Sequence, residues 1–330
     1  MPPQPIILAT GSYDRTIRFW EPSTGICVRQ LQFQDSQINC LAVSLDKSRL
    51  AAAGCIHLKL FDLTSSAQTH IASVEGHTQN ITGLGFMRNG CLYTCSEDGH
   101  IKVWDPKKLN ARYDLDNKCP VTCVVLHPNQ DEIICGDQLG RISVWRLSTA
   151  DSVPNGAAIL PAQQLCPSGD VAIRSIALNA SGDLCCIANN MGAVFCATVA
   201  PLDGSDILKV VHHYRAHQKY ILKCVLSPDS KLLATASADS TISLWQVPDE
   251  LEKPWLLSKT MTGHHRWVWD VAFAQDSQYI VSVSSDHMGR LWDVNKEKSI
   301  VSYSGHHKPV TCVVLDEVQN APKNNTSSKT

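Results

Sequence analysis

Histidine, serine and aspartate recur together four times in this chain, and these three side chains are the components of a hydrolytic catalytic triad. In each group a tryptophan follows the aspartate by six residues. Because one nucleophile is enough for catalysis, a fourfold repeat with a constant tryptophan favours a structural role. We therefore predict that the protein is not an enzyme. The groups are His77, Ser96, Asp98 and Trp104; His217, Ser237, Asp239 and Trp245; His264, Ser284, Asp286 and Trp292; and His306, Ser12, Asp14 and Trp20.

Metal and cofactor chemistry has weaker support. The adjacent histidines His212-His213, His264-His265 and His306-His307 would point to opposite faces of a strand, which is poor geometry for holding one ion. The 14 cysteines lack the paired spacing of a zinc finger and are more typical of buried thiols. The sequence has no phosphate-binding, dinucleotide-binding or kinase signature. We expect neither a metal nor a cofactor.

The elements that must position the four groups are short strands separated by turns. Between Ala216 and Trp245, apolar runs at 221–226, 232–236 and 241–245 alternate with turns rich in Ser, Asp and Pro. Such a meander cannot bury both faces alone, so it requires copies of itself. Similar units end at Trp20, Phe61, Trp104, Trp145, Ala197, Trp245 and Trp292. The first three steps lie in the roughly 40–45-residue range of a four-stranded propeller blade.

These units resemble WD repeats, with Gly76-His77 before Trp104-Asp105 and Gly263-His264 before Trp292-Asp293. The resemblance implies an all-β fold, a seven-bladed WD-repeat β-propeller. It also implies that each histidine of a group bridges the turn aspartate and the strand serine, and that the serine reaches the tryptophan indole. Every buried donor would then have a partner.

The two chain ends complement each other. The first unit lacks its first strand, and the strand pattern at 310–315 has no further unit behind it. We predict that the N- and C-terminal strands pair in one blade, which also unites the group split between His306 and residues 12–20. One propeller domain would then span residues 1–315, followed by a disordered polar tail at 316–330. The long polar connection at 148–170 is predicted to be an exposed loop.

Charge and hydropathy exclude several classes of function. The chain has 29 Lys and Arg residues against 31 Asp and Glu residues, which argues against nucleic-acid binding as its main role. No apolar run reaches 18 residues and no secretion signal is recognisable, so we predict no direct membrane insertion. We expect a monomeric, cytoplasmic propeller that works within a larger assembly.

One rim of the predicted propeller carries the best candidates for partner binding. At this rim the loops entering the first strands meet the turns between the second and third strands. Trp267-Val268-Trp269 places two indoles on the same side of a strand, and tryptophan is enriched in interface hot spots. Packing between blades is the alternative for these two side chains. The predicted partner-binding residues are Tyr13, Gln37, Asn39, Asn80, Tyr220, Trp267 and Trp269.

Several sequence segments go beyond the general repeat. ILATGSYDRTIRFWEPSTGIC at 7–27, FQDSQIN at 33–39 and RWVWDVAF at 266–273 look like the G-protein-β-like subunit of target-of-rapamycin kinase complexes. The resemblance spans all seven units. It implies a non-catalytic scaffold that binds and stabilises the C-lobe of the kinase together with other subunits, in growth and nutrient signalling. It also implies that Gln37, Asn39, Trp267 and Trp269 make that contact, in the cytoplasm or at endomembrane, lysosome or vacuole surfaces.

Other assemblies are alternatives for a WD-repeat chain. A substrate receptor of a ubiquitin ligase should carry Trp-Asp-x-Arg after a third strand, whereas Trp104-Asp105 is followed here by Pro-Lys. A subunit of an RNA-processing complex should present clustered basic residues on one rim, where the sequence predicts only Arg174 and scattered lysines. An adaptor of either kind is the second hypothesis.

Overall fold

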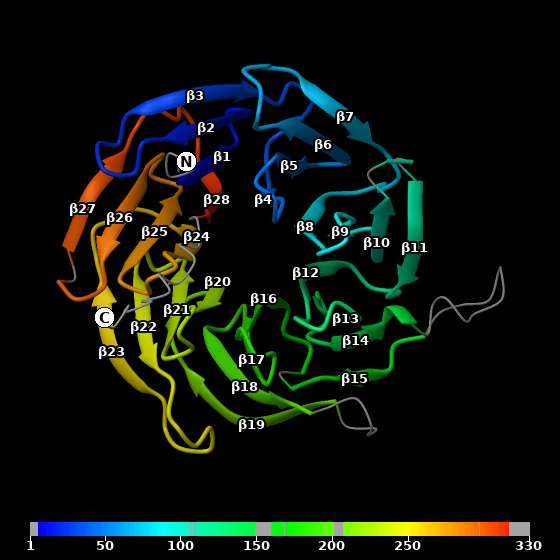
Figure 1. Ribbon diagram of the computed structural model, residues 1–330. Helices are drawn as coiled ribbons and strands as arrows, with labels where there is room; N and C mark the ends of the chain where they lie inside the picture. Colours follow the sequence, from blue (N-terminus) through cyan, green and yellow to red (C-terminus); the bar gives the residue numbers. More distant parts are fainter. Residues whose placement is uncertain are drawn as a thin grey trace, which may run out of the picture.

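The described residues form seven four-stranded antiparallel sheets arranged around a central channel (Figure 1). The computed structural model describes residues 6–316 except 106, 109, 149–159, 168, 201–206 and 297. The predicted all-β, seven-bladed propeller is therefore confirmed. Much of the predicted 148–170 loop lies outside the described residues, as do residues 317–330 of the predicted tail. The loop prediction is wrong for its described part at Gln163–Leu165, which forms the strand β15 by pairing with β14.

Each blade runs outward from the channel. The innermost strands are β28 (Val310–Asp316), β4 (Cys40–Val43), β8 (Ile81–Phe86), β12 (Val121–Leu126), β16 (Ile173–Leu178), β20 (Ile221–Leu226) and β24 (Val268–Phe273). The second strands are β1 (Ile7–Ser12), β5 (Arg49–Gly54), β9 (Leu92–Ser96), β13 (Glu132–Asp137), β17 (Leu184–Asn189), β21 (Leu232–Ser237) and β25 (Tyr279–Ser284). The third strands are β2 (Thr16–Trp20), β6 (His57–Asp62), β10 (His100–Asp105), β14 (Ile142–Arg146), β18 (Ala193–Val199), β22 (Ile242–Gln246) and β26 (Gly289–Asp293). The outermost strands are β3 (Cys27–Gln32), β7 (His70–Val74), β11 (Asn110–Asp116), β15 (Gln163–Leu165), β19 (Leu208–Arg215), β23 (Leu256–Met261) and β27 (Lys298–Tyr303). We number the blades in this order, from blade 1 (β28, β1, β2 and β3) to blade 7 (β24–β27).

The turn between first and second strands follows from its sequence. In blade 6 the Ser227 hydroxyl donates to the Asp229 carboxylate at 2.6 Å, and the backbone N–H of Leu232 donates to the Ser227 hydroxyl at 2.9 Å. Ser230 adopts a left-handed conformation with φ of 58°. Side chains that satisfy backbone groups locally in this way reverse the chain between two strands.

The two ends of the chain close the ring. β28 pairs antiparallel with β1, from Ile7 opposite Asp316 to Ser12 opposite Val310. The blue and red strands lie side by side in Figure 1. The predicted pairing of terminal strands is thus present, and the predicted start of the tail is wrong by one residue. Asp316 ends β28 and forms an ion pair with Lys47 of blade 2 at 2.9 Å.

The hydrophobic core consists of layers between neighbouring blades. In each layer the third strand of one blade faces the preceding blade, so that Trp104 of blade 3 packs with Leu58 and Leu60 of blade 2. Trp20, Trp145, Trp245 and Trp292 occupy the corresponding layers, and all are at least 92% buried. Blade 5 has the fully buried Ala197 at the predicted aromatic position, where Phe195, Ile207 and Leu208 pack in the same layer.

Around the channel, a side chain links each described blade to the next. In four junctions a side chain on an innermost strand, or just before it, donates to a backbone carbonyl of the following blade: Thr311 to Ile38 at 2.6 Å, Asn39 to Ile81 at 3.2 Å, Thr82 to Val121 at 2.7 Å, and Thr122 to Ile173. At the other three junctions the contacts differ. Ser175 of blade 5 accepts from the Cys224 N–H of blade 6 at 3.1 Å, and Lys223 of blade 6 forms an ion pair with Asp270 of blade 7 at 3.5 Å. Asp270 also accepts from the Val313 N–H of blade 1 at 3.0 Å. These links fix the spacing of the loops on the rim.

Candidate protein-binding rim

Each of the four predicted groups is a hydrogen-bonded chain that anchors the rim. In blade 3, His77 Nδ1 lies 2.8 Å from Asp98 Oδ2, and His77 Nε2 lies 2.8 Å from a hydroxyl. The same hydroxyl accepts from the Trp104 indole N–H at 2.8 Å. The corresponding His–Asp pairs are His217–Asp239 at 2.7 Å, His264–Asp286 at 2.8 Å and His306–Asp14 at 2.8 Å. The ring closure therefore assembles the group that the sequence splits between its ends.

The hydroxyl in each chain is not the predicted serine but the residue two positions earlier. It belongs to Thr10, Thr94, Thr235 and Ser282, which accept from the indoles of Trp20, Trp104, Trp245 and Trp292. The predicted residues, Ser12, Ser96, Ser237 and Ser284, are therefore wrong as partners of histidine and tryptophan. Residues two apart on a strand share one face, so the sequence allowed either choice. Cross-strand register decides, because Thr94 lies opposite Lys102 whereas Ser96 lies at the end of the strand.

The displaced serines have a different role, which positions the rim. The Ser237 hydroxyl donates to the Tyr220 carbonyl at 2.9 Å and accepts from the Asp239 N–H at 3.1 Å. The Ser284 hydroxyl donates to the Arg266 carbonyl at 3.1 Å, next to Trp267. Each serine thus ties the turn between second and third strands to the loop entering the first strand. These are the loops that carry the predicted binding residues.

Burial and hydrogen bonding set the charge state of these groups. Burial raises the pKa of the Asp239 and Asp286 carboxyls, but the hydrogen bonds and charges of His217 and His264, together with other hydrogen bonds, outweigh burial and lower each pKa to about 2. Burial lowers the pKa of the His77 and His306 imidazoles below the ordinary value, more than their aspartates raise it. A neutral imidazole that donates from Nδ1 to aspartate and accepts at Nε2 satisfies this geometry.

The arrangement does not fit nucleophilic catalysis. A serine hydrolase needs its nucleophile within reach of both histidine and substrate. Here the hydroxyl beside each histidine also holds an indole N–H, and Thr94, Thr235 and Ser282 are fully buried. The geometry of all four groups supports the predicted structural role.

Blade 4 contains a variant of the group that the sequence analysis missed. Asn117 stands four residues before Val121, as His77 stands four before Ile81, and it is 3% exposed. Its amide N–H donates to Asp137 at 3.3 Å, and its oxygen accepts from Ser143 at 3.0 Å. Asp137 in turn pairs with Arg141 at 2.8 Å. The signal in the sequence was the spacing of Asn117 from the strand.

Four of the predicted partner-binding residues lie side by side on the rim. We call them the aromatic row: Tyr220, Trp267, Trp269 and Tyr13. Ring centroids are 6.3 Å apart between Tyr220 and Trp267, 5.8 Å between Trp267 and Trp269, and 6.4 Å between Trp269 and Tyr13. The row crosses from blade 6 to blade 1. Tyr220 is 48% exposed and Trp267 is 43% exposed.

The two tryptophans of the row are held differently. Trp269 is half-buried, and its indole N–H donates to Ser285 at 2.6 Å. Trp267 has an exposed side chain, and its backbone carbonyl accepts from the Ser285 N–H at 2.9 Å. Neither indole lies in the layers between blades that bury Trp245 and Trp292. The alternative in which both tryptophans fill the core is therefore not what the structure shows.

The predicted polar residues lie farther round the same rim. Gln37 is exposed, and its carbonyl sits so close to Gly54 that a side-chain carbon there would lie 1.7 Å away, which makes glycine necessary at that position. Asn80 is exposed and donates to Glu97 at 2.8 Å. Asn39 is half-buried and uses its amide to link blades 2 and 3. Its partner-binding role stays a prediction, beside this structural one.

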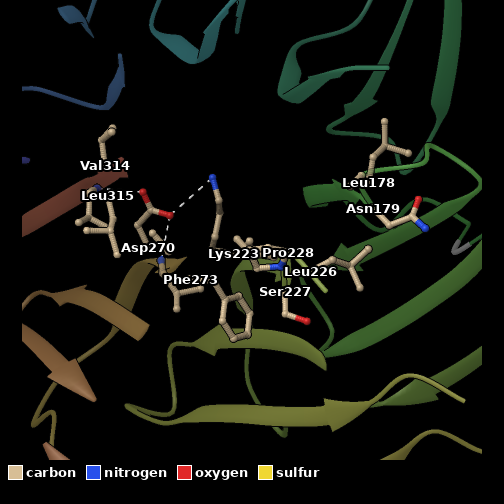
Figure 2. A pocket seen from close by; sticks show the side chains of 15 residues that line it. Leu178, Asn179, Lys223, Leu226, Ser227, Pro228, Asp270, Phe273, Val314 and Leu315 are labelled. Carbon is tan, nitrogen blue, oxygen red and sulfur yellow. Dashed lines mark hydrogen bonds and ion pairs between the residues drawn. The ribbon is translucent and has the colours of Figure 1, made fainter. Parts of the chain in front are cut away.

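The rim opens into the central channel. A cavity of about 400 Å³ at this mouth is lined by Tyr13, Asn39, Asn80 and Trp269, among other residues. A second pocket lies farther along the channel, where Figure 2 shows Lys223 extending toward Asp270. The carboxylate of Asp270 raises the pKa of Lys223, which favours the charged ammonium form of that lysine. In the part of the chain that the structure describes, no cluster of three or more His, Cys, Asp or Glu residues could hold a metal ion. Likewise, no described helix is both long and apolar enough to cross a membrane.

The fold and the four hydrogen-bonded groups define the chain as a WD-repeat β-propeller. The family model "WD domain, G-beta repeat" matches residues 1–21, 68–105, 208–246 and 255–293, and each matched segment ends one residue after a tryptophan of the four groups.

The chain is 42% identical to the target of rapamycin complex subunit wat1 of Schizosaccharomyces pombe, over 96% of this chain and 98% of that protein. It is 40% identical to LST8 of Saccharomyces cerevisiae and 36% identical to LST8 of Mus musculus, in each case over 95% of this chain. The match covers 99% of the former protein and 95% of the latter. The chain therefore belongs to the LST8 family of target of rapamycin complex subunits.

Proposed function

We propose that this protein is a non-catalytic subunit of a target of rapamycin complex that binds and stabilises the kinase through the aromatic row. The observation that carries the proposal is the continuous row of Tyr220, Trp267, Trp269 and Tyr13, of which Tyr220 and Trp267 are exposed, on a rim that is tied together by other contacts. The relatives' names supply the complex. The resemblance noted in the sequence supplies the kinase C-lobe as the contact.

The row has the properties of a binding hot spot. Trp267 and Tyr220 keep close to half of their surface exposed although they contact each other edge to face. Aromatic side chains expose large apolar areas with few rotatable bonds, so little conformational entropy is lost on binding. About 100 Å² of Trp267 is available to a partner, which corresponds to roughly 2.5 kcal/mol at 25 cal/mol per Å².

The surrounding contacts favour a preformed site. Trp269 is fixed by Ser285, the loop of Tyr220 by Ser237, and the loop of Trp267 by Ser284. A site whose loops are already ordered loses less entropy when a partner binds. A scaffold that stabilises a kinase needs such a rigid surface, because it can favour only the conformation that matches it.

The test is capture of the recombinant kinase catalytic region by purified variants, with a thermal melt for each. Trp267→Ala should weaken binding about 30-fold, since about 2 kcal/mol is lost. Ser285→Ala leaves both indoles intact but removes the acceptor of the Trp269 N–H, and so tests whether the row must be held by Ser285. Tyr279→Ala is the matched control, because Tyr279 is 36% exposed but starts β25 at the opposite end from the rim turn.

Two results would contradict the proposal. One is unchanged capture of the kinase by a folded Trp267→Ala variant. The other is a kinase whose melting temperature and activity do not respond to the wild-type subunit. Recovery of a ubiquitin ligase or an RNA-processing complex in place of the kinase would favour the alternative of a different WD-repeat adaptor.

A further inference from the structure

Exposed apolar residues occupy one particular turn position in two of the three blades that lack the histidine, blades 4 and 5. In blades 1, 3, 6 and 7 this position holds Asp14, Asp98, Asp239 and Asp286, which accept from the histidine of the blade. Blades 4 and 5 have Leu139 and Met191 there, which are 48% and 58% exposed. Turns normally carry Gly, Asn, Asp or Ser, so two large apolar side chains at this position call for a physical reason.

Internal hydrogen bonding is satisfied without these two positions. In blade 4 the carboxylate of Asp137, two residues earlier, accepts from the Leu139 N–H at 2.9 Å and from Asn117 at 3.3 Å. In blade 5 the amide oxygen of Asn189 accepts from the Met191 N–H at 2.9 Å and the Ala193 N–H at 3.0 Å. The turns are therefore closed by the earlier residue, and the side chains of Leu139 and Met191 remain exposed.

Contacts between neighbouring loops connect these two residues to the aromatic row along the rim. The Leu139 carbonyl accepts from Cys166, on the loop that leads into blade 5. Gly192, next to Met191, lies so close to the loop of His217 and Lys219 that a side-chain carbon would meet the carbonyls of both within 3 Å. Tyr220 follows on the same loop and contacts Trp267. The loops that carry Leu139, Met191 and Tyr220 thus follow one another along the same rim as the aromatic row.

The charges beside Leu139 and Met191 are mainly positive. Arg174 bonds the Asn190 amide oxygen at 2.6 Å, and Arg215 bonds the carbonyls of His217 and Gln218, so neutral acceptors hold both guanidinium groups. Lys219 is also exposed. An exposed acidic residue, Asp170, lies on the loop that leads into blade 5. We call this part of the rim, from Leu139 to Lys219, the arc. A partner that covers the arc must bring apolar side chains for Leu139 and Met191 and negative charge for the three cations.

We infer that Leu139 and Met191 form a second docking point for the protein that binds the aromatic row. The occupant of this second point is an acidic segment of that same partner protein, and it bears apolar side chains. This inference rests on the proposed function, because continuity with the row is what assigns the segment to the kinase. The row anchors the partner at blades 6, 7 and 1, and the second point determines how the partner is oriented across the ring.

The experiment measures the dissociation constant for the recombinant kinase catalytic region with full-length variants. Leu139→Ser with Met191→Ser should weaken binding about tenfold or more. The matched control is Leu256→Ser with Leu257→Ser, since these residues are 62% and 52% exposed but lie on the outermost strand β23. Lys219→Glu should weaken binding about threefold at low salt and less at high salt, whereas Lys231→Glu, on the turn between β20 and β21, should not.

A photo-crosslinking residue at position 191 supplies a second measurement that needs no loss of stability. Crosslinks to a kinase segment rich in Asp or Glu support the inference, and crosslinks to a segment without acidic residues overturn it. Wild-type affinity in a folded Leu139→Ser, Met191→Ser variant also overturns it while leaving the aromatic row intact. If the wild-type protein does not bind the kinase region, the proposed function fails as well.

Discussion

Replacing Thr94 by valine removes one hydroxyl that satisfies two buried groups in blade 3. The hydroxyl oxygen lies 2.8 Å from His77 Nε2 and 2.8 Å from Trp104 Nε1. Valine has nearly the same shape, so packing is retained while both nitrogen atoms lose their partner. A buried polar group without a partner costs about 1–3 kcal/mol, so two cost about 2–6 kcal/mol. Burial of Thr94 is complete, so water cannot readily substitute.

The assay is thermal unfolding of Thr94→Val beside Ser96→Ala, the residue that the sequence predicted for this role. Ser96 makes two hydrogen bonds at 3.1 Å, to the Gln79 carbonyl and from the Asp98 N–H, so its loss costs about 1–2 kcal/mol. At about 2 °C per kcal/mol for a chain of this size, Thr94→Val should lower the melting temperature by roughly 4–12 °C and Ser96→Ala by roughly 2–4 °C.

A double-mutant cycle separates the hydrogen bond from general packing. Trp104→Phe keeps an aromatic ring but removes the N–H, so it should couple with Thr94→Val and not with Ser96→Ala. A Thr94→Val variant that melts with the wild type, or an equal or larger effect of Ser96→Ala, would refute the assignment of the hydroxyl. Loss of a hydrolytic activity without loss of stability would refute the structural role itself.

Three further predictions concern stability. Because the folded-state pKa of His77 and His306 lies below the ordinary value, the unfolded chain binds more protons, and the melting temperature should fall as pH drops from about 7 to 5. Protonation of Asp239 and Asp286, whose pKa is about 2 against an ordinary 3.8, should remove further stability between about pH 4 and pH 2. A melting temperature that does not change across both pH ranges would contradict this prediction. Asp270→Ala should lower the free energy of unfolding by about 1–3 kcal/mol, because both Lys223 and the Val313 N–H lose their partner. Asp270→Asn can still accept from the Val313 N–H and should be less destabilising. Equal melting temperatures for the two variants would count against the link between blades 7 and 1. Deleting residues 310–330 removes β28 and should give a protein that is insoluble or unfolds without cooperativity, whereas deleting residues 319–330 should leave the melting temperature unchanged. A soluble, cooperatively unfolding 310–330 deletion would disprove the first expectation, and a destabilised 319–330 deletion would disprove the second.

Local patterns in the sequence predicted much of the architecture. Strands of period two, turns such as Ser227-Pro228-Asp229 and the regular tryptophans recur along the chain, so one blade could be extended to seven. Closure of the ring was predictable because Asp14 and Trp20 lacked a histidine until His306 was considered with them. Identification of Trp267 and Trp269 as a pair on one side of a strand also needed only alternation.

Other features depended on contacts between blades. The sequence offered Thr94 and Ser96 on one strand face, and only the register between β9 and β10 selected Thr94. Asn117 escaped notice because its role in blade 4 depends on Asp137 and Ser143 from other strands. Asn39 was assigned to partner binding, although its amide links two blades.

The sequence by itself determined the repeating unit, the number of units and the way the ends meet, because each of these follows from short-range alternation, turn chemistry and the spacing of histidine, aspartate and tryptophan. The tertiary structure alone decided which hydroxyl joins each chain of hydrogen bonds, which side chains link the blades around the channel, and that Tyr220, Trp267, Trp269 and Tyr13 touch in one row. The physical reason is that these contacts join residues on different strands and blades. Their distances are set by cross-strand register and by the curvature of the closed ring, neither of which is encoded in any single unit.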